Sequence, residues 1–165
     1  MKIKLIVLDV DGCLTDGKIV YTASGDELKS FNAKDGFAIV QWLSLGGKVA
    51  IITGRNSTIV AERAKELGID YCYQGVKDKL STLISLCELL HISFDNVAAI
   101  GDDLNDAKVL KSVKLSFAPS DAIGHIRKIV DVVLTKNGGD GAVREMIEML
   151  IRQEGLQEEY LSRWL

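Results

Sequence analysis

LIVLDVDGCLT, residues 5–15, is an apolar run of strand length that ends in two carboxylates and a glycine. Apolar residues on both faces favour a buried strand of a parallel sheet over about residues 4–10. Side chains two residues apart in a strand lie on the same side, so Asp9 and Asp11 can face one point. Two like charges this close repel each other unless a cation or a shared proton offsets them. The stretch therefore predicts a functional site, and Gly12 lets the chain turn away from it.

The composition is that of an ordinary globular domain. The chain has 165 residues, of which 47% are apolar and 26% charged, with a net charge of -3. This charge gives no reason to expect binding to nucleic acid or to an anionic membrane. Three cysteines without a C-x-x-C pair favour a reduced, cytoplasmic protein. The first apolar run breaks at Asp9, too early for a signal peptide, and no run approaches transmembrane length. We expect one domain over residues 1–165.

Strand and helix patterns alternate along the whole chain. This alternation predicts a doubly wound, mostly parallel α/β sheet of the Rossmann-like kind. Further strands are expected at 49–52, 69–73, 97–100, 115–117 and 132–134, and helices at about 35–46, 57–67, 78–90, 106–111, 121–128 and 142–153. Two short extended runs around a Ser-Gly-Asp turn predict a β-hairpin over about residues 17–32. The hairpin is expected at the same end of the sheet as the acidic pair, as a flap over the site or an oligomer contact.

Polar groups from separate segments are expected to meet at the carboxyl ends of the strands, where ligands bind in such sheets. Thr53–Arg55 follows the second strand, Asp102–Asp103 follows the fourth, and Lys79 opens the helix after the third. Carboxylates from two strands suit Mg²⁺, and a threonine hydroxyl, backbone N–H groups and a lysine suit a phosphate. Taken singly, each piece also fits a solvated turn, a helix cap or a surface lysine. Together they predict phosphoryl transfer.

The motifs D-x-D-G-x-L-T at 9–15, T-G-R at 53–55, Lys79 and G-D-D-x-N-D at 101–106 resemble those of the haloacid dehalogenase superfamily of phosphatases and phosphotransferases. The resemblance covers essentially the whole chain. It implies that Asp9 is the nucleophile, forms an aspartyl-phosphate and binds Mg²⁺. It also implies that Asp11 protonates the leaving alcohol and then activates water, while its main-chain carbonyl binds the metal.

The same resemblance assigns the remaining groups of the site. Asp102 would complete the metal site, with Asp103 and Asp106 in support. The residues implied to hold the phosphoryl group are Thr53, Gly54 and Lys79. Superfamily members often carry a cap domain that closes the site, but the segments after Thr15 and after Thr53 are too short to hold one. We therefore expect a capless member.

Within the superfamily, the chain resembles the capless phosphatases of 3-deoxy-D-manno-octulosonate 8-phosphate, an intermediate of lipopolysaccharide synthesis. The hairpin, the Tyr73-Gln74-Gly75 lead into Lys79 and the G-G-x-G-A-V-R-E run at 138–145 carry this likeness. It implies a homotetramer in which neighbouring subunits cover the active site. The C-terminal tail is also implicated there, and residues 155–165 are very apolar for a chain end. Asp140 departs from the expected basic or neutral residue, which puts the contacts of this loop in doubt.

Other functions remain open at this stage. A related phosphatase acts on a nine-carbon 2-keto sugar acid phosphate. A glutamate at position 55 would suggest that enzyme, but this chain has an arginine there. Arg55 favours the eight-carbon substrate, whose carboxylate an arginine can pair with. A phosphorelay receiver also combines Mg²⁺ with an aspartyl-phosphate, a threonine and a lysine, but it needs no second carboxylate for a leaving alcohol. A non-catalytic subunit would need neither Asp9 nor Asp11. Lys34, Asp35 and Arg144 are weaker candidates for substrate contacts.

Overall fold

A six-stranded parallel sheet forms the centre of the molecule in the computed structural model, which describes residues 2–165. The strand order is β5-β4-β1-β6-β7-β8, with every neighbouring pair parallel. The strands are β1 (Leu5–Leu8), β4 (Lys48–Ile52), β5 (Tyr71–Tyr73), β6 (Val97–Ile100), β7 (Leu115–Ala118) and β8 (Val132–Val133). All four residues of β1 are buried, which confirms the prediction of a central strand covered on both faces.

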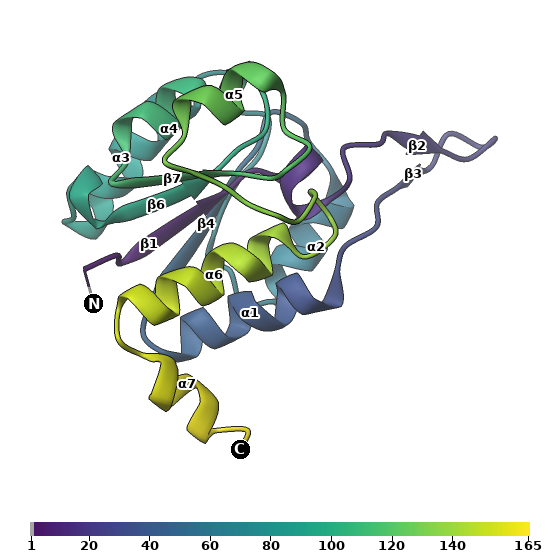
Figure 1. The fold of residues 1–165 in the computed structure, drawn as a ribbon. Helices are drawn as coiled ribbons and strands as arrows, with labels where there is room; N and C mark the ends of the chain where they lie inside the picture. Colours follow the sequence, from purple (N-terminus) through teal and green to yellow (C-terminus); the bar gives the residue numbers. More distant parts are fainter. Residues whose placement is uncertain (1) are drawn as a thin grey trace.

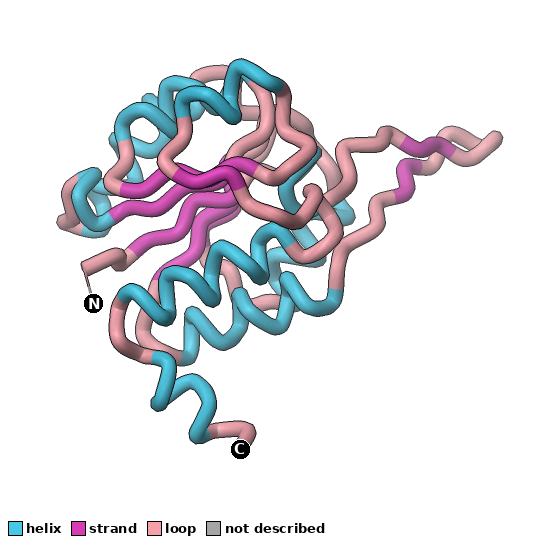
Figure 2. The backbone as a smooth tube through the Cα atoms, viewed as in Figure 1, coloured by secondary structure: helices cyan, strands magenta, loops and turns pink. Residues whose placement is uncertain are grey.

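Helices cover both faces of the sheet (Figures 1 and 2). One apolar core joins the sheet to α1 (Ala33–Ser44), α2 (Thr58–Glu66) and α6 (Ala142–Gln153). The other core joins it to α3 (Lys79–Leu90), α4 (Ala107–Ser112) and α5 (Gly124–Ile129). The doubly wound architecture predicted from the sequence is therefore confirmed. Short 3₁₀ turns, η2 (Phe94–Asn96) and η3 (Leu104–Asp106), precede β6 and α4.

Side-chain caps fix the start of two helices that lead from the site. Asn32 Oδ1 accepts a hydrogen bond from Lys34 N at 2.8 Å and begins α1. Asp78 Oδ1 accepts one from Ser81 N at 3.2 Å and begins α3, so that Lys79 is the first helical residue. These contacts satisfy N–H groups that have no partner within the helix.

A β-hairpin of β2 (Val20–Tyr21) and β3 (Glu27–Leu28) extends away from the body of the molecule (Figure 1). In the sequence the hairpin lies between β1 and α1, as predicted. Its strands are only two residues long, and large apolar side chains on it are exposed. Two-residue strands do not stabilise themselves in water, so contacts outside the hairpin must hold it.

Several predicted boundaries were wrong for identifiable reasons. The first strand ends at Leu8 rather than near residue 10, because the chain enters an irregular turn, η1 (Val10–Leu14), in which Asp11 and Gly12 have non-helical backbone angles. Asp9 and Asp11 therefore lie beyond the strand, and their relation does not follow from strand alternation. The tail also contains a short helix, α7 (Gln157–Ser162), that the sequence analysis did not expect. Tyr160 of this helix packs into the core shared with α1 and α6.

The order of the strands sets the location of the site. The chain passes from β1 outward to β4 and β5, then crosses back to β6 on the other side of β1. A crevice opens at the carboxyl ends of the strands where the winding direction reverses. The segment between β1 and β4 contains the η1 turn, the hairpin and α1, and the segment between β4 and α3 contains α2 and β5. Within residues 2–165, no helix is long and apolar enough to span a membrane.

Candidate active site

A pocket of about 470 Å³ lies at the carboxyl ends of β1, β4 and β6. Most residues predicted for the site line this pocket, although they come from three separate segments. The lining residues are Asp9, Asp11, Gly17, Thr53, Gly54, Arg55, Asp102, Asp103 and Asn105. The structure thus brings together the acidic pair, the Thr-Gly-Arg segment and the second acidic pair.

Asp9 is a buried carboxylate paired with a buried lysine. Lys79 Nζ donates to Asp9 Oδ1 at 2.7 Å, and the two side chains are 3% and 7% exposed. Burial and repulsion from Asp106 raise the pKa of Asp9 to about 6, although Lys79 opposes this shift. Oδ1 of Asp9 is occupied by the lysine, so the second oxygen is the one free to meet a ligand.

Lys79 links two acidic segments. Its ammonium group also donates to Asp106 Oδ1 at 2.6 Å. Burial alone would lower the pKa of Lys79, but Asp9 and Asp106 outweigh that effect and raise it, so the group stays charged. Asp106 Oδ2 accepts from Asp102 N at 3.1 Å and thereby fixes the loop after β6. Lys79 is therefore a buried member of the site and not a surface lysine.

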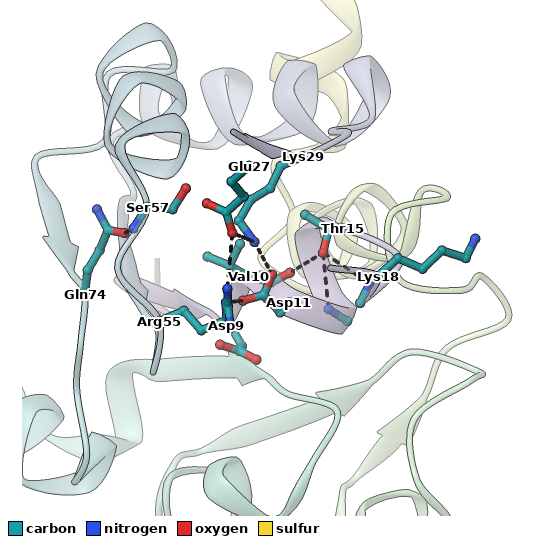
Figure 3. A network of polar contacts seen from close by, with 12 residues as sticks. Asp9, Val10, Asp11, Thr15, Lys18, Glu27, Lys29, Arg55, Ser57 and Gln74 are labelled. Atoms are coloured by element: carbon teal, nitrogen blue, oxygen red, sulfur yellow. Dashed lines mark hydrogen bonds and ion pairs between the residues drawn. The ribbon is translucent and has the colours of Figure 1, made fainter. Parts of the chain in front are cut away.

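The carboxylate of Asp11 pairs with different cations from that of Asp9. Lys29 Nζ, from the hairpin, lies 2.5 Å from Asp11 Oδ1, and Arg55 Nε lies 4.0 Å from Oδ2. Figure 3 shows Asp11 in contact with both side chains, with Glu27 beside Lys29 and above Arg55. The two carboxylates of the D-x-D motif thus have separate partners, which explains how they coexist a short distance apart.

The turn that carries Asp11 has a strained geometry. Gly12 has a φ angle of 98°, which residues with a side chain rarely adopt. A Cβ atom at this position would collide with the carboxylate of Asp102. Thr15 Oγ1 accepts from Gly12 N at 3.4 Å and from Gly17 N at 3.2 Å, which stabilises the turn. Gly12 is therefore needed for the close approach of the β1 and β6 ends.

Asp102 faces Asp9 across the pocket. Burial, followed by repulsion from Asp9, raises the pKa of Asp102 to about 8. Among the described residues, Asp102 has no cationic side chain within ion-pair distance. One ligand atom each from Asp9, Cys13 and Asp102 lies within 4.8 Å of the others. Burial raises the pKa of the Cys13 thiol well above its ordinary value, so Cys13 stays protonated and is a poor metal ligand.

This donor set fits a hard divalent cation. Asp9 is buried and Asp102 is half-buried, and the two carboxylates repel each other. Bound Mg²⁺ relieves such repulsion. The structure places the carboxylates of Asp9 and Asp102, the two predicted metal ligands, close together in one pocket. Asp103 is exposed, and its Oδ1 accepts from Leu104 N at 2.6 Å, so it caps the η3 turn. Its predicted supporting role is confined to this cap.

Thr53 and Gly54 form the wall opposite the acidic loop. Thr53 is 2% exposed, and its backbone bonds to β5 and to the following turn, with Thr53 N donating to Tyr73 O at 3.0 Å. Gly54 leaves the backbone accessible beside Asn105. The predicted phosphate-binding segment therefore lines the pocket within the same crevice as the acidic pair.

Some residues of the site escaped the sequence analysis. Lys29 and Glu27 approach Asp11 and Arg55 from the hairpin, yet no motif contains them. Conversely, Asp35 does not line this pocket: it is buried between α1 and α6, where its Oδ1 accepts from Arg144 N at 2.7 Å. The side chain of Arg144 bonds to Glu148 and Tyr160.

Comparison with known proteins gives one consistent family. The family model of haloacid dehalogenase-like hydrolases matches residues 72–147. The chain is similar to the 3-deoxy-D-manno-octulosonate 8-phosphate phosphatase KdsC of Escherichia coli K12, with 44% identity over 95% of this chain and 84% of that protein. It is also similar to the KdsC of Haemophilus influenzae, with 37% identity over 93% of this chain and 85% of that protein.

Solved structures give the same result. The Moraxella catarrhalis 3-deoxy-D-manno-octulosonate 8-phosphate phosphatase, in complex with magnesium, phosphate and KDO, has a TM-score of 0.97 and 38% identity. The match covers 99% of this chain and 94% of that one. The cobalt-bound phosphatase from Haemophilus influenzae has a TM-score of 0.90 and 36% identity, covering 93% of this chain and 90% of that one.

Proposed function

This chain belongs to the haloacid dehalogenase-like hydrolases, and we propose that it is a Mg²⁺-dependent phosphatase that hydrolyses 3-deoxy-D-manno-octulosonate 8-phosphate to the free sugar acid and phosphate. The buried Asp9–Lys79 pair that faces Asp102 in one pocket is the observation that carries this function. The pocket volume suits a sugar phosphate. The likeness to phosphatases of this substrate supports its identity.

The residues of the pocket divide the work of phosphoryl transfer. The free oxygen of Asp9 attacks phosphorus, and the bond from phosphorus to the sugar oxygen breaks as Asp11 donates a proton to that oxygen. In the second step Asp11 takes a proton from water, whose oxygen attacks phosphorus and releases Asp9. Lys79, Thr53 and the N–H of Gly54 bind the phosphoryl oxygens.

Mg²⁺ would be held by Asp9, Asp102 and the main-chain carbonyl of Asp11. When bound, it offsets the negative charge of the phosphoryl group and of the carboxylates. Lys79 supplies a second, permanent positive charge on the other side of Asp9. Arg55, 43% exposed at the rim of the pocket, is the residue we assign to the carboxylate of the sugar acid.

The setting of the enzyme is part of the same proposal. We infer that residues 1–165 act as one phosphatase domain, in the cytoplasm, as a homotetramer that contributes to lipopolysaccharide precursor synthesis. The exposed apolar side chains of the hairpin, next to the pocket, support assembly. The three cysteines are free, which agrees with a reducing compartment.

Phosphate release from the eight-carbon substrate is the first experiment. We expect turnover that requires Mg²⁺ and falls by at least roughly a thousandfold in Asp9→Asn, which keeps the shape but loses the nucleophile. A panel with the nine-carbon sugar acid phosphate and simple sugar phosphates is measured in parallel. Faster turnover of another phosphate in the panel would identify that compound as the substrate and would leave the proposed reaction unchanged. If the protein becomes phosphorylated once and does not release phosphate repeatedly, it is a receiver, and the proposal is contradicted.

A further inference from the structure

Lys29 is a buried lysine that no part of the proposed mechanism uses. It lies directly after β3 in the returning arm of the hairpin, and its side chain is 1% exposed. Burying an ammonium group is unfavourable unless anions surround it. Lys29 Nζ meets two of them, Asp11 Oδ1 at 2.5 Å and Glu27 Oε1 at 3.5 Å.

These contacts belong to a closed ring of four alternating charges. Asp11 Oδ2 lies 4.0 Å from Arg55 Nε, and Arg55 Nη2 lies 3.4 Å from Glu27 Oε1. The ring joins the turn after β1, the segment after β4 and the hairpin, as the dashed contacts in Figure 3 show. Tyr21 Oη accepts from Arg55 Nη2 at 3.0 Å and adds a second link to the hairpin.

The two cations of the ring differ in their access to the pocket. Arg55 lines the pocket and is 43% exposed, whereas Lys29 does not line it. Arg55 can therefore turn towards a bound anion, while Lys29 can act on the substrate only through Asp11. Lys29 holds Oδ1 of Asp11, and the other oxygen, Oδ2, lies 4.0 Å from Nε of Arg55, a residue that lines the pocket. No other hydrogen-bond donor to the Asp11 carboxylate occurs within residues 2–165.

We infer that Lys29 is the positioning residue of the general acid: it fixes the Asp11 carboxylate so that Oδ2 delivers its proton to the leaving sugar oxygen. The inference rests on the role of Asp11 in the proposed function. In this step the Oδ2–H bond breaks, the proton joins the sugar oxygen, and that oxygen keeps the electron pair of the broken P–O bond. The hairpin is thereby part of the catalytic unit of its own chain.

The leaving group distinguishes a positioning role from a structural one. A sugar alcohol is a poor leaving group and needs the proton, whereas p-nitrophenolate leaves without it. We expect Lys29→Met to lower kcat/KM for the sugar phosphate by roughly 10- to 100-fold, within the range of general acid catalysis. For p-nitrophenyl phosphate the decrease should stay below about threefold, since kcat/KM does not include hydrolysis of the aspartyl-phosphate.

Two further variants complete the experiment. Lys18→Met removes an exposed lysine of the same hairpin, paired only with Asp16, and should leave both substrates unchanged. Lys29→Arg keeps the charge and should recover part of the activity on the sugar phosphate. If Lys29→Met does not fold, as judged by circular dichroism and melting, Lys29→Gln takes its place in the comparison of kcat/KM on the two substrates. Equal losses on both substrates, or no folded variant, would overturn the assignment in favour of a structural role.

The same measurements separate this inference from the proposed function. Wild-type protein that hydrolyses neither substrate refutes the phosphatase itself. Wild-type turnover together with an unchanged ratio of the two kcat/KM values in Lys29→Met refutes only the role of Lys29. Turnover of a different alkyl phosphate keeps the test intact, because that compound then replaces the sugar phosphate in the ratio.

Discussion

Three carboxylates of the pocket differ in their ion pairs, and these differences support the roles proposed for them. Asp9 is held by Lys79, and Asp11 by Lys29. Asp102 has neither, and burial and repulsion raise its pKa to about 8. A fixed orientation suits the nucleophile proposed at Asp9, and an unmet negative charge suits the metal ligand proposed at Asp102. Lys29 fixes the orientation of Asp11, the proposed general acid.

The raised pKa values predict a link between pH, metal and stability. A carboxyl whose pKa is raised in the folded state binds more protons folded than unfolded, so the free energy of unfolding falls as pH rises from about 4 to about 8. Asp102, with a folded-state pKa of about 8, and Asp9, with one of about 6, both act in this direction. Mg²⁺ binds the charged forms and reverses the loss. We expect one fixed Mg²⁺ concentration, equal to a hundred times the Kd at pH 8, to raise Tm by about 5–10 °C at that pH.

Calorimetry at about pH 6 and pH 8, with and without Mg²⁺, measures this link. The increase in Tm should be larger at pH 8. Burial raises the pKa of Asp35 to about 6, but Asp35 contributes equally to Tm with and without Mg²⁺ at a given pH, so its effect cancels in the comparison. Asp102→Asn should melt higher than the wild type without metal at pH 8 and respond little to Mg²⁺. An equal Mg²⁺ effect at both pH values would contradict this assignment of the metal site.

At the scale of elements, the η1 turn is held in place by a distant loop. Gly139 N donates to Cys13 O at 3.0 Å, and Gly138 N donates to Asp121 Oδ1 at 3.0 Å. A Cβ at Gly138 would collide with the carbonyl groups of Gly12 and Thr15. The glycine run before α6 therefore serves as a backbone clamp on the turn that carries Asp11.

Gly138→Ala tests this clamp. Because the clash is with backbone and not with a flexible side chain, we expect a loss of about 1–3 kcal/mol of stability, or about 3–10 °C in Tm. Phosphatase activity should fall at the same time, since Asp11 moves with the turn. Gly124→Ala is the control: its Cβ would meet open space at the first residue of α5 and should cost nothing. Similar Tm values for the two variants would refute the clamp.

At the scale of the whole molecule, the hairpin and the tail lie far apart (Figure 1). The tail packs on its own chain, with the rings of Phe37 and Trp164 5.1 Å apart and Arg144 Nη2 donating to Tyr160 Oη at 2.8 Å. The hairpin exposes Tyr21 (58%) and Leu28 (52%), and the end of the tail also exposes Trp164 (58%) and Leu165 (99%). We expect the proposed tetramer to depend on the hairpin, because its exposed apolar residues lie next to the pocket.

Val20→Asp tests this dependence. Val20 pairs with Leu28 across the hairpin, and both side chains are exposed, so a charge there should disfavour contact between hairpins without unfolding the chain. Light scattering should give about four times the mass of a single chain for the wild type and a smaller mass for the variant. Leu89→Asp is the control, since Leu89 is 63% exposed on α3, and should leave the mass unchanged. A monomeric wild type would refute the tetramer.

The sequence by itself determined the architecture and most of the pocket. Alternating strands and helices specify a parallel sheet, and a parallel sheet gathers the ends of its strands at one edge, so Asp9, Thr53 and Asp102 had to meet. Each of these residues lies within two positions of the end of a strand, where local pattern is informative. The site could be predicted because its parts sit at fixed positions in the repeating unit.

Only the tertiary structure decided which groups pair within the pocket. The side chain of Lys29 is buried while its neighbour Leu28 is exposed, the reverse of what hydrophobicity favours, because Lys29 reaches Asp11 while the hairpin extends outward. The turn after Leu8 likewise depends on the contact with Gly138, more than a hundred residues away along the chain. Ion pairs between remote segments leave no periodic pattern in a sequence, since their energy arises only when folding excludes water from both partners.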